Sequence, residues 1–120
     1  MDIDKLRKII DKSIDKVTEK GWSVEPDMWI SRAGSTCCPL GSVYLDAIGI
    51  PAPTNITSRA AVDCEVHLLS ILGMDRDEIY SFSDGYDGQG YDKNKHVFKL
   101  WNLGRSYRSK YPRKSYESEG

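Results

Sequence analysis

The chain has 120 residues, of which 39% are hydrophobic and 29% charged, so one folded domain with a core can form and the chain need not be disordered. No apolar run approaches the ~18–20 residues that cross a membrane, and the first residues lack the pattern of a secretion signal. Three cysteines, two of them adjacent, do not make a disulfide framework. We therefore expect a reduced, cytoplasmic protein without a membrane partner.

The N-terminal half predicts two helices and one irregular segment. Apolar residues recur at spacings of three and four over residues 3–20, which predicts an amphipathic helix. Residues 22–36 are apolar without a clean period, so we expect an irregular segment there, held by its tryptophans. Pro39 suits the first position of a helix, because its missing N–H costs nothing there, and a second helix is predicted over 39–48.

The C-terminal half predicts three further helices, over residues 58–72, 76–83 and 93–110. Asp75 and Glu78 form a capping-box pair at the start of the middle one. Residues 84–90 are rich in glycine and predict a loop, after which Asp92 caps the last helix. No segment alternates as a strand does.

These elements predict an all-α fold, a compact single domain of four to five helices with long irregular loops. The domain is expected to span residues 1–111, followed by a polar tail over 112–120. Its core is predicted to contain Leu6, Ile10, Ile14, Leu40, Val43, Leu68, Leu72, Ile79, Phe82, Leu100 and Trp101.

The net charge of −1 hides a strong asymmetry. Residues 1–92 hold 9 Lys/Arg and 16 Asp/Glu, which gives −7, whereas residues 93–116 hold 8 Lys/Arg and no acid, which gives +8. Glu117 and Glu119 bring the sum back to −1. Cations interleaved with aromatic rings suit phosphates and unpaired bases, and equally an acidic protein. The binding residues that we predict are Lys99, Arg105, Tyr107, Arg108, Lys110, Arg113 and Lys114.

That basic helix also has a structural interpretation. The spacing of Leu100, Trp101, Gly104 and Tyr107 puts them on one inward face. The helix then packs on the acidic remainder of the chain, with its arginines pairing with Asp84 or Asp87, or its outer face is merely solvated.

The acidic loop that contains Asp84, Asp87 and Asp92 is a possible functional loop. Its oxygen ligands suit calcium, but the spacing does not fit an EF-hand, and no phosphate-binding motif is present. The alternative, which we favour, is a tight turn whose aspartates accept hydrogen bonds from backbone amides.

The adjacent thiols Cys37 and Cys38 are possible reactive groups. Cys38 directly precedes Pro39, so its sulfur is expected at a helix N-terminus, where the backbone N–H groups lower a thiol pKa. With His67 or His96 as a base it would be a nucleophile. The alternative is a pair of small core residues that pack beside Trp29.

Cys64 and His67 lie three residues apart, so on a helix they share a face and could ligate zinc together with the adjacent thiols. The usual Cys-x-x-Cys pair is absent, and Cys64 falls on the apolar stripe. We therefore predict no metal, no cofactor and no intramolecular disulfide. Cys64 should be buried and slow to alkylate, and Cys38 should be the most reactive thiol if its sulfur reaches the helix N-terminus.

Three short segments resemble a loose group of small bacterial and phage proteins of unknown activity. The segments are Cys37-Cys38-Pro39-Leu40-Gly41, then Leu72-Gly73-Met74 with Phe82 and Gly85-Tyr86-Asp87-Gly88, and finally Leu103-Gly104-Arg105 with Arg108 and Tyr111. The resemblance implies that they belong to one structural unit, in which Gly104 lets another element approach the last helix closely.

Three classes of function follow, in order of preference. The first is a small non-enzymatic binding protein, an adaptor or inhibitor of a phage-type accessory kind, that docks on another macromolecule, a protein before a nucleic acid. The second is a nucleic-acid-binding module that uses the basic C-terminal helix. The third is a cysteine-based enzyme or zinc protein, which lacks a complete catalytic constellation.

Overall fold

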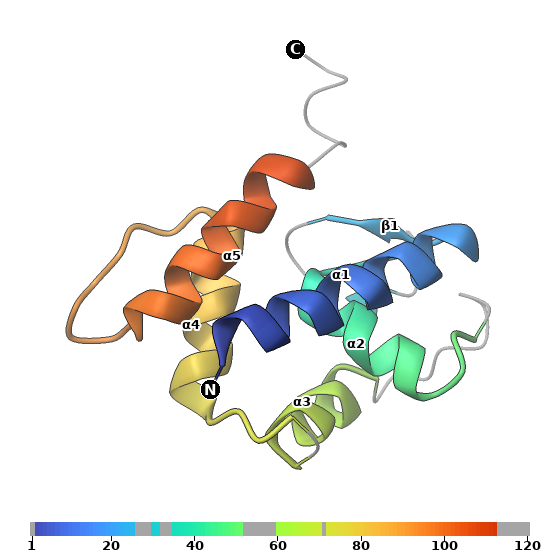
Figure 1. Ribbon diagram of the computed structural model, residues 1–120, viewed down its shortest axis with the longest axis horizontal. Coiled ribbons are helices and arrows are strands. Elements are labelled where there is room, and N and C mark those ends of the chain that lie inside the picture. The colour runs from blue at the N-terminus through green and yellow to red at the C-terminus, as the bar shows by residue number, and fades with distance from the viewer. Residues whose placement is uncertain (1, 26–29, 32–34, 52–59, 71, 113–120) are drawn as a thin grey trace.

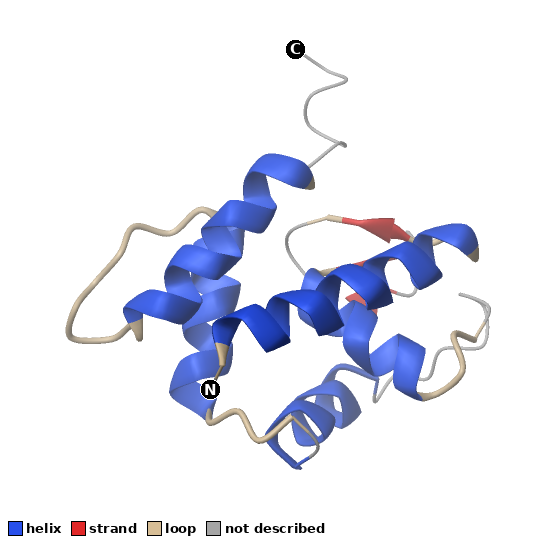
Figure 2. Ribbon diagram, in the orientation of Figure 1, coloured by secondary structure: helices blue, strands red, loops and turns tan. Residues whose placement is uncertain are grey.

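The computed structural model describes residues 2–25, 30–31, 35–51, 60–70 and 72–112 (Figure 1). In this part of the chain five helices account for most of the backbone, and the strands are three pieces of two residues each (Figure 2). The mainly helical domain predicted from the sequence is confirmed. None of the described helices is long and apolar enough to cross a membrane.

The first helix, α1 (Ile3–Glu19), forms as its apolar stripe predicts. Asp2 caps it, because one carboxylate oxygen accepts the N–H of Asp4 at 3.0 Å and that of Lys5 at 3.3 Å. The residues of the stripe are buried: Leu6, Ile10, Ile14 and Val17. This face packs on α2 (Pro39–Ala47), which begins with proline as expected.

A small sheet replaces part of the irregular segment expected over residues 22–36. Its strands are β1 (Ser23–Val24), β2 (Ile30–Ser31) and β3 (Thr36–Cys37). β3 lies in the middle, parallel to β1 and antiparallel to β2. The expectation was wrong here because strands of two residues are too short to show alternation. Trp22 is buried beside the sheet and donates to the carbonyl of Pro51 at 3.2 Å, whereas Trp29 lies outside the described residues.

The third and fourth helices are α3 (Ala60–Ser70) and α4 (Arg76–Asp87). The capping box of α4 is confirmed, since Asp75 accepts the N–H of Glu78 at 2.8 Å and Glu78 accepts the N–H of Asp75 at 2.9 Å. The helix continues four residues beyond its predicted end. Residues 84–87 are therefore helical, and the loop predicted over 84–90 begins only at Gly88.

The last helix, α5 (Phe98–Lys110), begins five residues later than predicted. Its N-cap is Val97, whose N–H donates to the hydroxyl of Ser81 at 2.7 Å. A side chain of α4 therefore accepts a backbone hydrogen bond from the start of α5. Asp92 caps a turn instead, because its carboxylate accepts the N–H of Asn94 at 2.9 Å. The loop 88–97 carries the chain back, so α4 and α5 run in the same general direction (Figure 1).

Two glycines allow α4 and α5 to touch along their backbones. A Cβ built on Gly85 would overlap the carbonyl oxygen of Trp101, and one built on Gly104 would overlap the carbonyl oxygen of Phe82. Each helix therefore presents a glycine where the other presents a carbonyl. The close approach predicted at Gly104 is confirmed, and its partner is the backbone of α4 at Phe82 and Tyr86.

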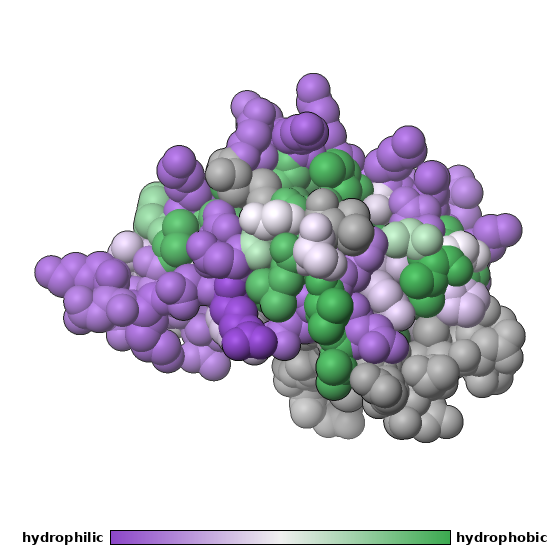
Figure 3. Space-filling model, turned by 90° about the horizontal axis from the view of Figure 1, so that it is seen from below, coloured by the Kyte–Doolittle hydropathy of each residue, from purple (hydrophilic) through white to green (hydrophobic). Residues whose placement is uncertain are grey.

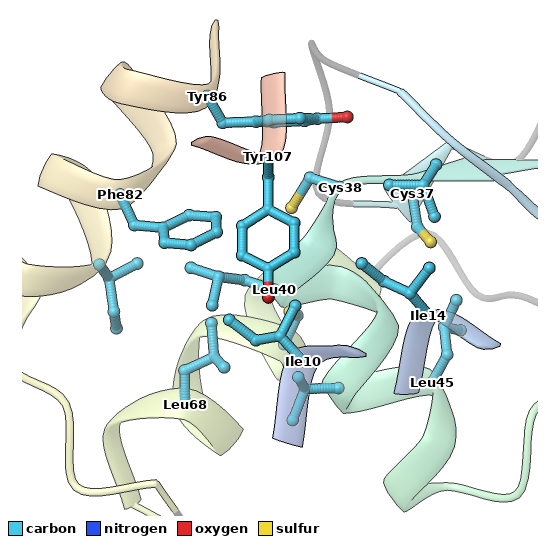
Figure 4. Close-up of a cluster of buried hydrophobic side chains, with 14 of the residues drawn as sticks. Ile10, Ile14, Cys37, Cys38, Leu40, Leu45, Leu68, Phe82, Tyr86 and Tyr107 are labelled. Atoms are coloured by element: carbon cyan, nitrogen blue, oxygen red, sulfur yellow. The ribbon is translucent and has the colours of Figure 1, made fainter. Parts of the chain in front are cut away.

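One core joins the five helices and β3 (Figure 4). The predicted core residues are buried, except Leu72, which is only partly buried and packs against the cluster. The three segments that carry the resemblance contribute to this same core through Cys38, Leu40, Met74, Tyr86 and Leu103.

Candidate binding surface

His96 fixes the loop between α4 and α5. The residue is 9% exposed, and its Nδ1 accepts the backbone N–H of Asp92 at 2.9 Å. Because Nδ1 is an acceptor, the ring proton belongs on Nε2, which donates to Asp84 Oδ2 at 2.8 Å. The N–H groups of Lys95 and His96 in turn donate to the carbonyl of Asp92. The imidazole thus ties the loop to α4.

Asp84, Asp87 and Asp92, the predicted functional loop, have separate roles. Asp84 accepts a hydrogen bond from His96. Asp92 accepts a backbone N–H in a turn, which is the role that the favoured interpretation predicted for the aspartates of this segment. Desolvation raises the pKa of Asp87, the charge of Asp84 adds to this, and Arg108 opposes it. Among the residues that the structure describes, no group of three His, Cys, Asp or Glu side chains is placed to hold a metal ion.

Three aromatic side chains meet where this loop reaches α5. Tyr91 packs edge-on against Phe98, with ring centroids 5.1 Å apart, and lies 5.4 Å from Trp101. Trp101 is the buried member at 9% exposure, and its indole N–H donates to the carbonyl of Gln89 at 2.9 Å. Tyr91 and Phe98 are 42% and 53% exposed. The exposed rings of Tyr91 and Phe98 therefore pack on the buried ring of Trp101.

Four cations lie close to these rings along the chain. Lys93, Lys95, Lys99 and Arg105 are exposed, and the guanidinium of Arg105 lies 5.5 Å from the ring centre of Trp101. None of the four has an ion-pair partner among the described residues. We call the four cations with Tyr91, Phe98 and Trp101 the aromatic–basic surface. Loop 88–97 projects at the left of Figure 1, and the same edge is hydrophilic in Figure 3.

The structure divides the predicted binding residues. Lys99, Arg105 and Lys110 are exposed, as a binding role requires. Arg113 and Lys114 lie outside the described residues. Placing Tyr107 among the binding residues was wrong, because it is 2% exposed and its hydroxyl donates to Asp11 Oδ1 at 2.6 Å. Its ring belongs to the core between α1 and α4 (Figure 4).

Arg108 is also engaged within the protein. Its Nη1 donates to the carbonyl of Tyr86 at 3.1 Å, and a Cβ on Gly88 would contact the same guanidinium. A cation at this position neutralises the carbonyl end of α4. The structural interpretation of the basic helix therefore holds for Arg108, although the partner is a helix terminus. Asp84 pairs with His96 and with no arginine among the described residues.

Tyr91 and Phe98 were missed by the sequence analysis. A signal was present, because Phe98 lies off the inward stripe of α5 and both rings are interleaved with lysines. Tyr107, the ring that was predicted to bind, stands between arginines in the sequence, whereas helical spacing turns it toward the core.

The cysteines gather in the core and lose their acidity there. The sulfur of Cys38 reaches the N-terminus of α2 as predicted and accepts the N–H of Gly41 at 3.3 Å. Burial nevertheless raises the pKa of Cys38 to about 12, against the hydrogen bonds from Gly41 and Leu40 that lower it. The expectation of an acidic thiol was wrong, because removing a thiolate from water outweighs two weak bonds to sulfur. Burial also raises the pKa of Cys37 and of Cys64.

The histidine candidates do not complete a nucleophile. His96 is occupied by Asp84 and Asp92. His67 packs edge-on against Tyr44, with ring centroids 5.7 Å apart, and burial lowers its pKa. Cys64, which was predicted to be a core residue and not a zinc ligand, is buried.

Alkylation measures the reactivity of these thiols directly. At pH 8 the native protein should lose its three free thiols to iodoacetamide at least 100-fold more slowly than a protein unfolded in guanidinium chloride, because the thiolate is the nucleophile. Cys38 is expected to react first, since Cys37 and Cys64 are more completely buried. Peptide mapping by mass spectrometry gives the order, and fast labelling of Cys38 in the native state would contradict the burial argument.

Comparisons of this chain with known protein families, curated proteins and solved structures found no match. The geometry of the site is therefore the basis on which a function is argued.

Proposed function

We propose that this protein is a small non-enzymatic binding protein that docks on another macromolecule through the aromatic–basic surface. The observation that carries the proposal is the exposure of Tyr91 and Phe98 among four cations that have no ion-pair partner in the described chain. Exposed large rings beside cations are costly to leave in water and are typical of contact surfaces.

The elements that carry the aromatic–basic surface are held in place, which also favours a binding function. The rings stand on α5, which the glycine contacts hold against α4, and on a loop that His96 ties down. A surface that is already ordered loses little conformational entropy when a partner binds. The buried thiols support a role other than cysteine catalysis, since a nucleophile needs an accessible thiolate.

Charge reversal tests this proposal. The double variant Lys99→Glu/Arg105→Glu should retain at least tenfold less partner than the unaltered protein when immobilised and exposed to extract of the source cell, because like charges then face each other. The matched control is Lys8→Glu/Lys12→Glu, which makes the same change of charge on the exposed face of α1. Equal capture by both variants would contradict the proposed surface.

A further inference from the structure

From the composition and shape of this surface we infer that its occupant is single-stranded nucleic acid. The exposed rings stack on unpaired bases, and the surrounding cations contact the phosphates. This inference rests on the proposed function and names the class of partner for the same site.

The kinds of polar residue on the surface distinguish the occupant from a protein. Three of the four cations are lysines, and the exposed outer face of α5 continues with Asn102, Ser106 and Ser109. Lysine and serine are depleted in protein–protein interfaces, where arginine is the preferred cation. Lysine, arginine, asparagine and serine are among the residues that contact phosphates. Residues 93–112 contain no acid, so nothing within that segment repels a polyanion.

The rings distinguish a single strand from a duplex. Phe98 and Tyr91 meet at an interplanar angle of 84°, so they form a corner and not one flat plate. Trp101 lies behind Phe98 with its ring 28° from parallel and 6.2 Å away, which supports the phenyl ring from the buried side. A base that is already paired and stacked in a duplex has no free face for such a ring, whereas a single strand offers one at every nucleotide.

The spacing of the elements suits a strand that passes over the corner. Lys93 and Lys95 lie in the loop that follows Tyr91, and Lys99 and Arg105 lie on α5 beyond Phe98. The cations thus lie before and after Phe98 in the chain, in the loop and on the helix. His96 holds the loop in place through Asp84 and the N–H of Asp92, so the arrangement exists before any ligand arrives.

Fluorescence anisotropy with the full chain tests the inference. The probes are a labelled single-stranded 20-nucleotide DNA of mixed sequence, the matching RNA, the DNA duplex, and labelled polyglutamate as an acidic polypeptide, all at 50 mM salt. Four phosphate contacts predict a fall in affinity for the single strand of about 50-fold between 50 and 200 mM salt.

Substitutions of the ring separate stacking from simple contact. Phe98→Leu keeps an apolar side chain but removes the flat face, and should weaken single-strand binding about tenfold and duplex binding less than threefold. Phe98→Trp should restore the single-strand affinity. Lys99→Ala should weaken both nucleic acids alike, whereas Lys12→Ala on α1 should change neither. Unchanged far-UV circular dichroism and thermal midpoint establish that each variant is folded.

The outcomes separate this inference from the proposed function. Tight binding of polyglutamate, with Phe98→Leu without effect on the single strand, would overturn the nucleic acid and leave an acidic protein as the occupant. Equal affinity for strand and duplex would overturn stacking. If no polyanion binds at 50 mM salt, the inference fails. The proposed function then stands only if capture from extract still depends on Lys99 and Arg105.

Discussion

Replacing Gly85 or Gly104 by alanine is expected to lower the free energy of unfolding by about 3 kcal/mol or more, with a fall in the thermal midpoint of about 10 °C. Alanine is normally favoured over glycine within a helix by roughly 0.5–1 kcal/mol. The predicted sign is therefore opposite to that of helix propensity, and the effect comes from the contact between α4 and α5.

The magnitude follows from what the new methyl group would meet. At Gly85 it would overlap the carbonyl oxygen of Trp101 and lie 3.1 Å from the backbone nitrogen of Arg105. At Gly104 it would overlap the carbonyl oxygen of Phe82 and lie 3.0 Å from the nitrogen of Tyr86. Backbone atoms cannot move away by a change of rotamer as a side chain can, so the two helices must separate. This separation would loosen the packing of Phe82 and Tyr107.

Gly90→Ala is the matched control for this prediction. Nothing lies within 4 Å of a Cβ at that position, and Gly90 lies in loop 88–97, next to Tyr91. Its replacement should change the stability by less than about 1 kcal/mol, because only the entropy of the unfolded chain is affected. Urea unfolding followed by tryptophan fluorescence measures all three variants. A loss at Gly104→Ala no larger than at Gly90→Ala would show that the helices are not in backbone contact.

The second large effect is expected at alkaline pH, where the protein should unfold cooperatively between about pH 9 and 12. Burial holds the pKa of Cys38 at about 12 and raises those of Cys37 and Cys64 in the folded protein. In the unfolded chain a thiol ionises near its ordinary pKa of 9.0. Above that pH the unfolded state has lost protons that the folded state retains, so stability falls as pH rises.

The slope makes this loss of stability comparable to the whole free energy of unfolding of a small domain. Each buried thiol that ionises only on unfolding removes about 1.4 kcal/mol per pH unit, and three remove about 4 kcal/mol per pH unit. Native domains have only about 5–15 kcal/mol in total. Burial also raises the pKa of Tyr86 and of Tyr107, and both add to the loss above pH 10. Below about pH 8 these groups leave the stability unchanged.

Cys38→Ser tests the assignment to the thiols. Serine keeps a side-chain acceptor for the N–H of Gly41 at the start of α2, and does not ionise in this range. Stability in urea, measured at pH 7.5, 9.5 and 10.5, should fall less steeply in this variant, by about 1.4 kcal/mol per pH unit. A free energy of unfolding that stays constant up to pH 10.5 in the unaltered protein would contradict the burial of all three sulfurs.

Local sequence was sufficient wherever one element determined its own structure. The stripe of Leu6, Ile10 and Ile14 makes α1 amphipathic whatever it packs against, since residues three and four apart share a face. Asp75 caps α4 because its bond partner is only three residues away. The position of the Cys38 sulfur at the start of α2 followed from Pro39 in the same way.

Contacts between distant segments decided the rest. Residues 84–87 read as a glycine-rich loop, yet they are helical because Gly85 has to meet Trp101 across the helix pair. The sequence also does not reveal that the Tyr107 hydroxyl donates to Asp11, which is 96 residues away in the chain. This contact places Tyr107 in the core and not on the binding face. The acidity of Cys38 was decided by the core that closes over α2, because desolvation depends on every neighbour of the sulfur.

The candidate surface shows the same division. The excess of cations after residue 92 is a property of the sequence alone. Which rings accompany those cations was decided by tertiary structure, because α5 buries Trp101 and Tyr107 against its neighbours and leaves Phe98 outside. Tyr91 joins Phe98 only because His96 folds the loop onto α4 through Asp84. Charge adds up along a chain, whereas exposure depends on which faces the packing covers.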